Sequence, residues 1–539
     1  MQTLRQIELL ALLLALTIAV WLISAYRWRA TEPETLGVMH AGDPAETLTL
    51  AFSTYLGGSN EDTVRDVTTD REGNIYLTGG TGSSNFPTTP GAYDRMFNSG
   101  GNSLGSAGPH DVFVVKLSPS GQLLWSTLLG GPNYDRAYAI EVDSQGSIYI
   151  AGRAGDGFPT TAGSAQPKFG GDVNPNSLYG QQDGFVAKLS PDGSQVIWST
   201  YLGGDDRSFI RDIDVDGSGN VYLVLTDVSR PNPHITPGAF QTQLQGGVDG
   251  VIAKMASSGS RLLWATYLGG SGYDVGTPSI RVDAQGYPYV LGFTNSSNLP
   301  TTLGAYDRTY NGGGDFYLAK LLPDGSNLVY GTYLGGSQVE FSETHGFALD
   351  AQGDGYVAAT TKSPDFPTSP GAFQRIYGGS GDASTGGNTN YPGDAFVAKI
   401  SADGSQLLAS TFVGGRFGEG TEGVAVDTQG NVYLSGATYS DNFPVTTGAF
   451  KASNSGSSDF FAVKLSANLS QLLYATYLGG SDDDYARTAH ADSRGNFYVA
   501  GHTTSNNWPT RNALQACRHG NWDGALAKFT LDARTGGVR

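Results

Sequence analysis

Short stretches of alternating apolar and polar residues run through most of the chain and are separated by turn residues. Residues 137–143 (AYAIEVD) alternate and end in Asp, and they are followed by residues 147–152 (SIYIAG), 183–189 (DGFVAKL) and 195–202 (QVIWSTYL). Alternation over such short lengths is typical of β-strands. The pattern therefore predicts four consecutive strands in this region.

The same four-strand pattern returns along the chain. Seven phrases related to STYLGG begin at residues 53, 126, 199, 265, 331, 410 and 475, and their first glycines lie 65 to 79 residues apart. Four short strands per repeat make one blade of a β-propeller, so the repeats predict an all-β, seven-bladed fold.

The two ends of the repeat region indicate how the ring closes. The last unit supplies strand patterns at residues 486–492, 496–501 and 523–529 and then lacks a fourth. Residues 48–56 (LTLAFSTYL) match the missing strand. Because an unpaired sheet edge is a liability, we expect this amino-terminal strand to complete the last blade, giving a propeller over residues 48–539.

The amino terminus differs from the rest of the chain. After a short tail at residues 1–8, residues 9–26 carry no charge and are just long enough to span a bilayer, and residues 27–47 read as a tether. A cleaved signal peptide is the alternative, but Ile23 suits a cleavage site poorly and Arg27 and Arg29 follow at once. We expect a retained transmembrane anchor, and flanking charges that are nearly balanced leave its orientation open.

Composition and charge exclude some functions. The chain has 77 glycines, only 15% charged residues and a net charge of -18. Such acidity argues against binding nucleic acid through phosphate contacts. Cys517 is the single cysteine, which excludes an intrachain disulfide framework and a cysteine-based metal cluster.

The repeat resembles a known family. The phrases STYLGG, VDxxGNVY, NFPTTPGAY and DxFVAKL are similar to those of the bacterial SBBP repeats, and the VDxxGNxY core is similar to NHL propeller repeats. The resemblance covers residues 48–530. It implies a propeller on an exported or surface-anchored bacterial protein, and it implies no shared catalytic site. The third copy departs from it, with PNPHIT at residues 231–236 in place of the FPTT stretch.

Two recurring patterns have a structural explanation. Each repeat holds a D-x-x-G turn, and Asp and Gly suit the first and fourth positions of a tight hairpin. Each repeat also holds D-x-x-x-x-K, whose two residues point to opposite faces of a strand. We expect each lysine to pair with an aspartate of a neighbouring strand or blade.

Candidate binding residues lie in two kinds of loop, the one that follows each L-G-G phrase and the long loop of each repeat. Both kinds should lie on the same face of the disc, which we call the loop face. A carboxylate recurs four residues after the second glycine of L-G-G, and structural use is the preferred role because one carboxylate per blade is too dispersed to hold calcium. Three insertions, at residues 99–110, 170–182 and 378–393, add further contact candidates. The predicted loop-face residues are Asp62, Asp135, Asp274, Glu340, Glu419, Asp484, His110, Tyr179 and Tyr391.

Residues that break the sevenfold pattern are the candidates for catalysis. On the strands that end in the turn aspartate, which lie innermost if the blades follow the order of NHL propellers, these are Glu141, Asp214, Arg281 and His490, with Glu343 and His345 in the fifth copy. They are spread over several blades, and the chain has no H-E-x-x-H and no P-loop, so we predict no catalytic residues, no cofactor and no metal site.

The sequence therefore predicts a non-catalytic interaction or assembly module, held by its helix to the membrane of a bacterium, with the propeller in the periplasm or on the cell surface. Its partner would be another protein or membrane complex, or a surface polysaccharide. The alternative is a periplasmic carbohydrate-binding protein or a lyase or hydrolase acting on carbohydrate. An asymmetric cluster of acids, His or Arg in a deep channel mouth would favour that alternative.

Overall fold

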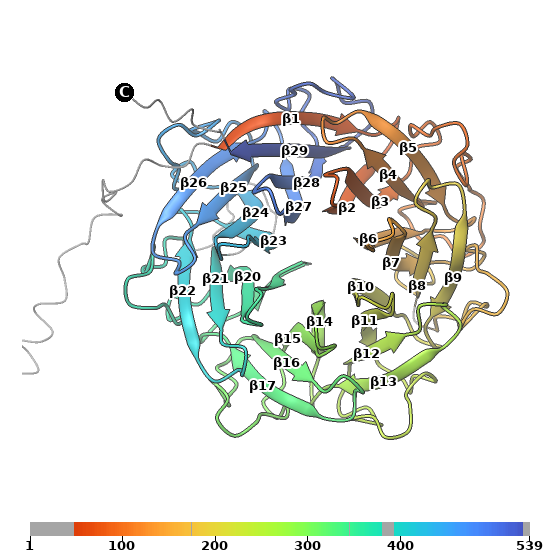
Figure 1. Ribbon diagram of the computed structural model, residues 1–539, viewed down its shortest axis with the longest axis horizontal. Helices are drawn as coiled ribbons and strands as arrows, with labels where there is room; N and C mark the ends of the chain where they lie inside the picture. The colour runs from red at the N-terminus through yellow and green to blue at the C-terminus, as the bar shows by residue number, and fades with distance from the viewer. Residues whose placement is uncertain (1–47, 174, 344, 380–392, 532–539) are drawn as a thin grey trace, which may run out of the picture. The chain divides into compact units, whose positions relative to one another are not determined.

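The computed structural model describes residues 48–173, 175–343, 345–379 and 393–531, and the secondary structure in these ranges is entirely β-strand. The strands form seven antiparallel sheets around a central axis (Figure 1). The predicted seven-bladed β-propeller is confirmed. The predicted transmembrane helix at residues 9–26 lies outside the described residues, and within the described ranges no helix has the length and apolar character needed to cross a membrane.

The first four blades each contain four strands in chain order. Blade 1 is β2 (Asp62–Thr69), β3 (Ile75–Thr81), β4 (Asp111–Leu117) and β5 (Leu123–Leu129). Blade 2 is β6 (Arg136–Val142), β7 (Ile148–Ala154), β8 (Asp183–Leu189) and β9 (Val196–Leu202). Blade 3 is β10 (Phe209–Val215), β11 (Val221–Val228), β12 (Asp249–Met255) and β13 (Leu262–Leu268). Blade 4 is β14 (Asp274–Val282), β15 (Pro288–Thr294), β16 (Asp315–Leu321) and β17 (Leu328–Leu334).

Blade 5 differs because its first strand is interrupted. It comprises β18 (Glu340–Phe341), β19 (Phe347–Leu349), β20 (Gly355–Thr361), β21 (Asp394–Ile400) and β22 (Leu407–Val413), and both β18 and β19 pair with β20. Blade 6 is β23 (Glu419–Val426), β24 (Val432–Thr438), β25 (Asp459–Leu465) and β26 (Leu472–Leu478). Of the blades described so far, those whose first strand is labelled in Figure 1 have it innermost, at β2, β6, β10, β14 and β23, so the predicted strand order is confirmed there.

Blade 7 joins the two ends of the repeat region. It orders β27 (Asp484–Ala491), β28 (Phe497–Thr503) and β29 (Asp523–Leu531) beside β1 (Leu48–Leu56). The register of β1 on β29 runs from Leu48 opposite Leu531 to Leu56 opposite Gly524. The predicted closure by the amino-terminal strand is therefore correct, and β1 covers the outer edge of β29.

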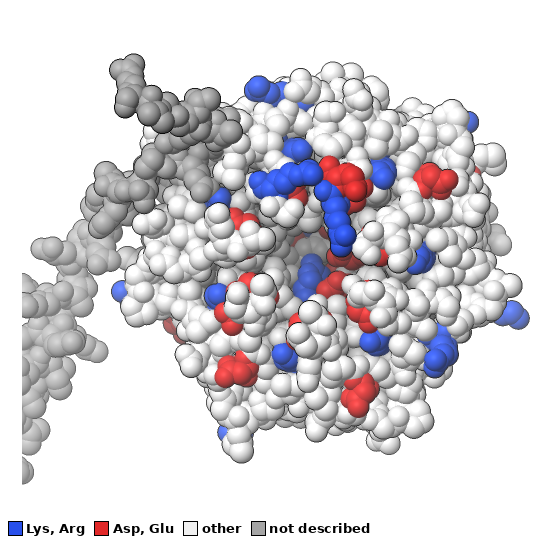
Figure 2. All heavy atoms as spheres, viewed as in Figure 1, with Lys and Arg blue, Asp and Glu red and all other residues white. Residues whose placement is uncertain are grey.

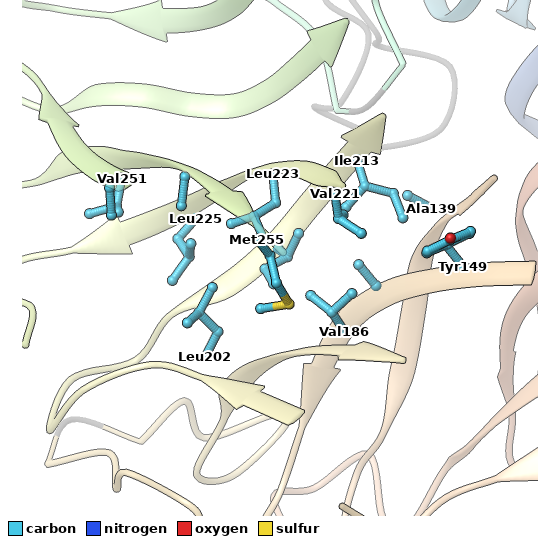
Figure 3. Close-up of a cluster of buried hydrophobic side chains, with 14 of the residues drawn as sticks. Ala139, Tyr149, Val186, Leu202, Ile213, Val221, Leu223, Leu225, Val251 and Met255 are labelled. Carbon is cyan, nitrogen blue, oxygen red and sulfur yellow. The ribbon is translucent and has the colours of Figure 1, made fainter. Parts of the chain in front are cut away.

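Apolar side chains fill the space between neighbouring blades. Between blades 2 and 3, Val186 and Leu202 face Leu223 and Met255, and all four are buried (Figure 3). Similar clusters lie between the other blades. Because each sheet buries both faces against its neighbours, the strands read as nearly continuous apolar runs, and burial of this surface is the main stabilising contribution.

Each blade has a polar anchor at its D-x-x-G turn. In blade 2 the carboxylate of Asp143 accepts hydrogen bonds from the backbone of Gln145 and Ser147, and Gly146 has a φ of 81°. Tyr149 and Lys188 reach the same carboxylate, at 3.1 and 3.4 Å. This lysine to turn-aspartate pair recurs in blades 1 to 6 at 2.9 to 3.9 Å. The predicted pairing with a neighbouring strand is confirmed there, whereas Lys528 of blade 7 donates to the carbonyl of Pro119.

Candidate functional site

A β-bulge interrupts the register of the innermost strand in six blades, and in each case it falls three residues after the recurring loop-face position. In blade 5 the same position lies in the break between β18 and β19. A bulge residue leaves the strand ladder and its side chain is re-aimed. We call these seven residues the bulge ring: Arg65, Tyr138, Arg211, Thr277, Glu343, Glu422 and Arg487.

The bulge ring is strongly asymmetric. Blades 7, 1 and 3 contribute arginines, whereas blades 5 and 6 contribute Glu343 and Glu422. Two further arginines, Arg136 and Arg153, lie opposite each other in the register of β6 and β7. Like charges at directly opposed positions destabilise a sheet, so this pair needs a compensating anion or aromatic contact.

The arginines gather around one tyrosine. The guanidinium carbons of Arg65, Arg136, Arg153 and Arg211 lie 4.7 to 5.4 Å from the ring centre of Tyr138. Arg136 also donates a hydrogen bond to the Tyr138 hydroxyl at 2.6 Å. We call Arg65, Arg136, Arg153, Arg211 and Arg487 the arginine cluster.

Burial and charge act against each other on Tyr138. Burial alone would raise its pKa, but Arg136, Arg153, Arg211 and Arg65 outweigh it and lower the pKa to about 6. The cluster also affects itself, because burial and the charge of Arg136 lower the pKa of Arg65 to about 10. At neutral pH Tyr138 is therefore largely a phenolate, which supplies one negative charge to the group.

Several donors of the arginine cluster are buried and lack a hydrogen-bond partner among the described residues. These are the Nε atoms of Arg65, Arg136, Arg153 and Arg211, together with Nη1 of Arg211. The side chain of Glu343 pairs with Arg65 at 3.3 Å and with Arg487. A buried donor without a partner costs about 1 to 3 kcal/mol, so the cluster is set up to accept further acceptor atoms.

Glu343 and His345 of blade 5 reach across the ring to residues of other blades. Glu343 contacts arginines of blades 1 and 7, and His345, with a φ of 52°, bonds the carbonyl of Tyr138 in blade 2 at 3.0 Å. The His345 ring also lies 3.9 Å from Asp66 and 3.8 Å from Asp212. Sequence analysis noted both residues only as scattered candidates, whereas the structure places them at the axis.

Two of the three predicted insertions form one surface next to the arginine cluster. Ser106 and Ala107 of the first donate backbone hydrogen bonds to residues 177 and 178 of the second. Between the insertions the Tyr134 ring packs at a tilt against His110 and Tyr179, with ring centres 4.6 and 4.9 Å apart. The guanidinium of Arg153 lies 3.7 Å from the Tyr179 ring centre. Two predicted residues thus meet at the cluster, while Tyr391 lies outside the described residues.

The six predicted loop carboxylates are fully buried in the turns. Each accepts a hydrogen bond from the backbone nitrogen of the second L-G-G glycine, at 2.6 to 3.2 Å; the residues are Asp62, Asp135, Asp274, Glu340, Glu419 and Asp484. This arrangement favours the structural role that sequence analysis preferred. That they bind a ligand stays a prediction.

Other symmetry-breaking residues lie at the opposite ends of the inner strands. Glu141, Asp214 and Arg281 interact there, and burial followed by Asp214 raises the pKa of Glu141. Arg281 pairs with Asp212 at 2.7 Å, and His490 bonds the hydroxyl of Thr69. These groups satisfy one another and tie neighbouring inner strands together.

The central opening and a groove on blades 2 and 3 are hollows of the described surface. Figure 2 shows charged side chains of both signs around the central opening on the face in view. A groove of about 580 Å³ lies where the third copy departs from the repeat, lined by Gln166, Lys168, Arg230, Pro231, Pro233 and His234 among others. Across the described ranges no group of three or more His, Cys, Asp or Glu side chains is placed to hold a metal ion.

The family models agree with this architecture. A model described as a β-propeller repeat, SBBP, matches residues 51–87, 124–159, 197–224 and 421–444. The predicted resemblance to SBBP β-propeller repeats is confirmed for these four stretches. A second model, a β-propeller domain of unknown function, matches residues 302–326.

One curated relative is similar over a long stretch. The SBBP propeller is 25% identical over 374 residues to the regulatory protein FlaEY of Caulobacter vibrioides, covering 65% of this chain and 34% of that protein. The chain thus spans about a third of that relative's length.

Solved propellers are similar at low identity. The WD40 domain of Doa1 (TM-score 0.43, 9% identity) covers 90% of this chain and 98% of its own, and a polysaccharide lyase of family PL25, an ulvan lyase, (TM-score 0.41, 12% identity) covers 84% and 92%. The WD40 domain of Neurospora crassa Pan2 has a TM-score of 0.41 at 7% identity over 91% of this chain and 97% of its own. Likenesses at this level have no bearing on function.

Proposed function

We propose that this SBBP propeller is a non-catalytic binding module, held at a bacterial membrane by residues 9–26, that captures its partner at the loop face around the arginine cluster. The membrane location rests on the uncharged segment of the sequence and on the family resemblance. The observation that carries the proposal is the asymmetry of this face. Two insertions pair with each other, and Tyr179 of the second lies beside Arg136 and Arg153 of the arginine cluster.

Two further features support binding over catalysis. The bulge ring is placed by backbone bulges of rigid strands, which suits a fixed recognition surface. Tyr138 is fully buried and its hydroxyl oxygen accepts a hydrogen bond from Arg136, so the hydroxyl is occupied. The relative named as a regulatory protein also accords with an interaction role.

The test is a pull-down of the detergent-solubilised full chain with identification of whatever co-purifies, protein or polymer. Val173 and Leu178 of the second insertion are 52% and 43% exposed, and replacing both by Ser should abolish capture. The matched control is Leu303→Ser, since Leu303 is 90% exposed in the long loop of blade 4. Capture that survives the double variant, or that is lost equally in the control, would contradict the proposed surface.

A carbohydrate lyase is the second candidate, and one observation favours it. The phenolate of Tyr138, which lies among arginines, could remove the proton from the carbon beside a sugar carboxylate. The electron pair left on that carbon forms a C=C bond while the C–O bond to the next sugar breaks. The leaving oxygen takes up a proton. Incubating the chain with acidic polysaccharides and following the ultraviolet absorbance of unsaturated uronate tests this. A signal that disappears in Tyr138→Phe would replace the binding proposal by the enzyme.

A further inference from the structure

The arginine cluster has more positive charge than the groups around it neutralise. Five guanidinium groups face Glu343 and Glu422 of the bulge ring and the ionised Tyr138. Asp66, deeper in the channel, is already engaged by Thr488 and by the backbone of Ile140. The excess charge and the unpartnered Nε donors both require acceptor oxygens with negative charge.

We propose that the arginine cluster binds the carboxylate of an acidic sugar, a uronic acid unit of a surface polysaccharide. This inference rests on the proposed function and names its ligand. Guanidinium forks bind carboxylates through paired hydrogen bonds. Arg65 and Arg211 lie 5.0 and 4.7 Å from the Tyr138 ring centre and have buried donors without a partner among the described residues.

The walls of the site suit a sugar ring. Tyr134, Tyr179 and Phe209 lie within 3.7 to 5.3 Å of the Arg153 guanidinium, so aromatic faces and charge occur side by side. Aromatic rings pack on the C–H faces of sugars while their polar edges remain available for hydrogen bonds. The half-buried residues Arg136, Tyr179 and Arg211 keep part of this wall open to the channel.

The mixture of charges also distinguishes the ligand class. The carboxylate of Glu343 is 27% exposed at the edge of the cluster and accepts hydrogen bonds, which sugar hydroxyls donate. A run of acidic side chains brings carboxylates but no hydroxyl groups that could donate to Glu343. A uronic acid combines one carboxylate with several hydroxyl groups. Its carboxylate suits the arginines of the bulge ring, and its hydroxyl groups suit Glu343.

Calorimetric titration of the solubilised full chain tests the assignment. The probes are di- and trisaccharides of galacturonate, glucuronate or mannuronate, with neutral galactobiose as the uncharged comparison and oligoglutamate as the acidic peptide. At least one uronate should bind, and Arg211→Gln should weaken it by about tenfold or more. Arg308→Gln removes the same charge from an exposed position of blade 4 and should leave the affinity within about twofold.

Arg136→Gln serves as a second variant if Arg211→Gln does not fold, as judged by circular dichroism. Uronates that bind no better than galactobiose, or that bind Arg211→Gln like the unaltered chain, would overturn the inference. Binding of oligoglutamate alone would overturn it in favour of an acidic protein segment. In either case a partner still captured through Val173 and Leu178 would leave the proposed function standing, so the two failures are distinguishable.

Discussion

Tyr138 occupies the one bulge position where a single aromatic ring contacts four arginines, and its ionisation governs the charge of the site. The charged and titratable groups around it come from blades 1, 2, 3, 5 and 7: Arg65, Asp66, Tyr134, Arg136, Arg153, Tyr179, Arg211, Glu343, His345, Arg487 and His502. Burial and nearby arginines lower the pKa of His502, so this ring stays neutral at neutral pH and in mild acid.

The affinity for an acidic sugar should therefore depend on pH. The pKa of Tyr138 is lowered to about 6, so the phenolate competes with an anion above that pH and is protonated below it. Uronate affinity should rise about fivefold or more as the pH falls from about 8 to about 5. Tyr138→Phe should bind almost equally at both values, whereas Tyr93→Phe, at an exposed tyrosine, should keep the dependence. Equal slopes in both variants would show that another group titrates.

The arginine cluster could have been found from the sequence, although our sequence analysis did not find it. The recurring loop position is a carboxylate in six copies and Ser208 in the third, and counting three residues beyond it gives Arg65, Tyr138, Arg211, Thr277, Glu343, Glu422 and Arg487. Regular alternation along a strand predicts the wrong direction for the side chain at this position, because a bulge shifts the register and re-aims the side chain. His110 and Tyr179 were predicted from their insertions, but their contact with the cluster depends on tertiary pairing of the two loops.

At the scale of strands and turns, the repeated motif encodes most of the structure. The D-x-x-G turn, the tyrosine six residues after its aspartate and the lysine of the third strand form one buried polar unit in blade 2, at Asp143, Tyr149 and Lys188. The predicted strands agree with the observed ones to within two residues, as in 195–202 against Val196–Leu202. Such agreement is expected where turn chemistry and alternation specify the same boundary.

Breaking this unit should destabilise one blade. Lys188→Met keeps the length of the side chain but leaves the hydroxyl of Tyr149 and the carboxylate of Asp143 without their cation. We expect a loss of about 1 to 2 kcal/mol in the free energy of unfolding, because both groups are largely buried. Chemical denaturation measures it, and Lys168→Met, outside this unit, is the control. A change below about 0.3 kcal/mol would show that the pair contributes nothing net.

At the scale of the whole molecule, buried acids occur at the junctions between blades. A side chain at Gly335 would place its Cβ 2.6 Å from oxygens of both Asp315 and Glu340, so the first L-G-G glycine leaves room for two carboxyl groups. Burial raises the pKa of Asp111 and Asp183 to about 8 and of Asp135 to about 7. Both kinds of acid belong to patterns visible in the sequence, the loop carboxylates and the aspartates of D-x-x-x-x-K, but their pairing across strands of different blades was not predicted.

These acids should make the propeller more stable in mild acid. Their pKa values are higher in the folded chain than the ordinary value of about 4, so the stability they contribute is complete below about pH 4 and is lost as the pH rises through about 7 to 8. The melting temperature should be higher by about 5 °C or more at pH 5 than at pH 8. Asp135→Asn should reduce that difference. A melting temperature that rises with pH would contradict the assignment.

The closed ring carries arginines on one side of the bulge ring and glutamates on the other, and we propose that the face around the arginine cluster is the binding site. Hydrogen exchange of the full chain, with and without the tightest-binding uronate oligosaccharide, tests this proposal. Bound uronate should slow exchange at residues 62–67, 135–140, 209–213 and 484–488 and in the paired insertions. Protection confined to the groove at residues 166–170 and 230–234, or no protection anywhere, would contradict it.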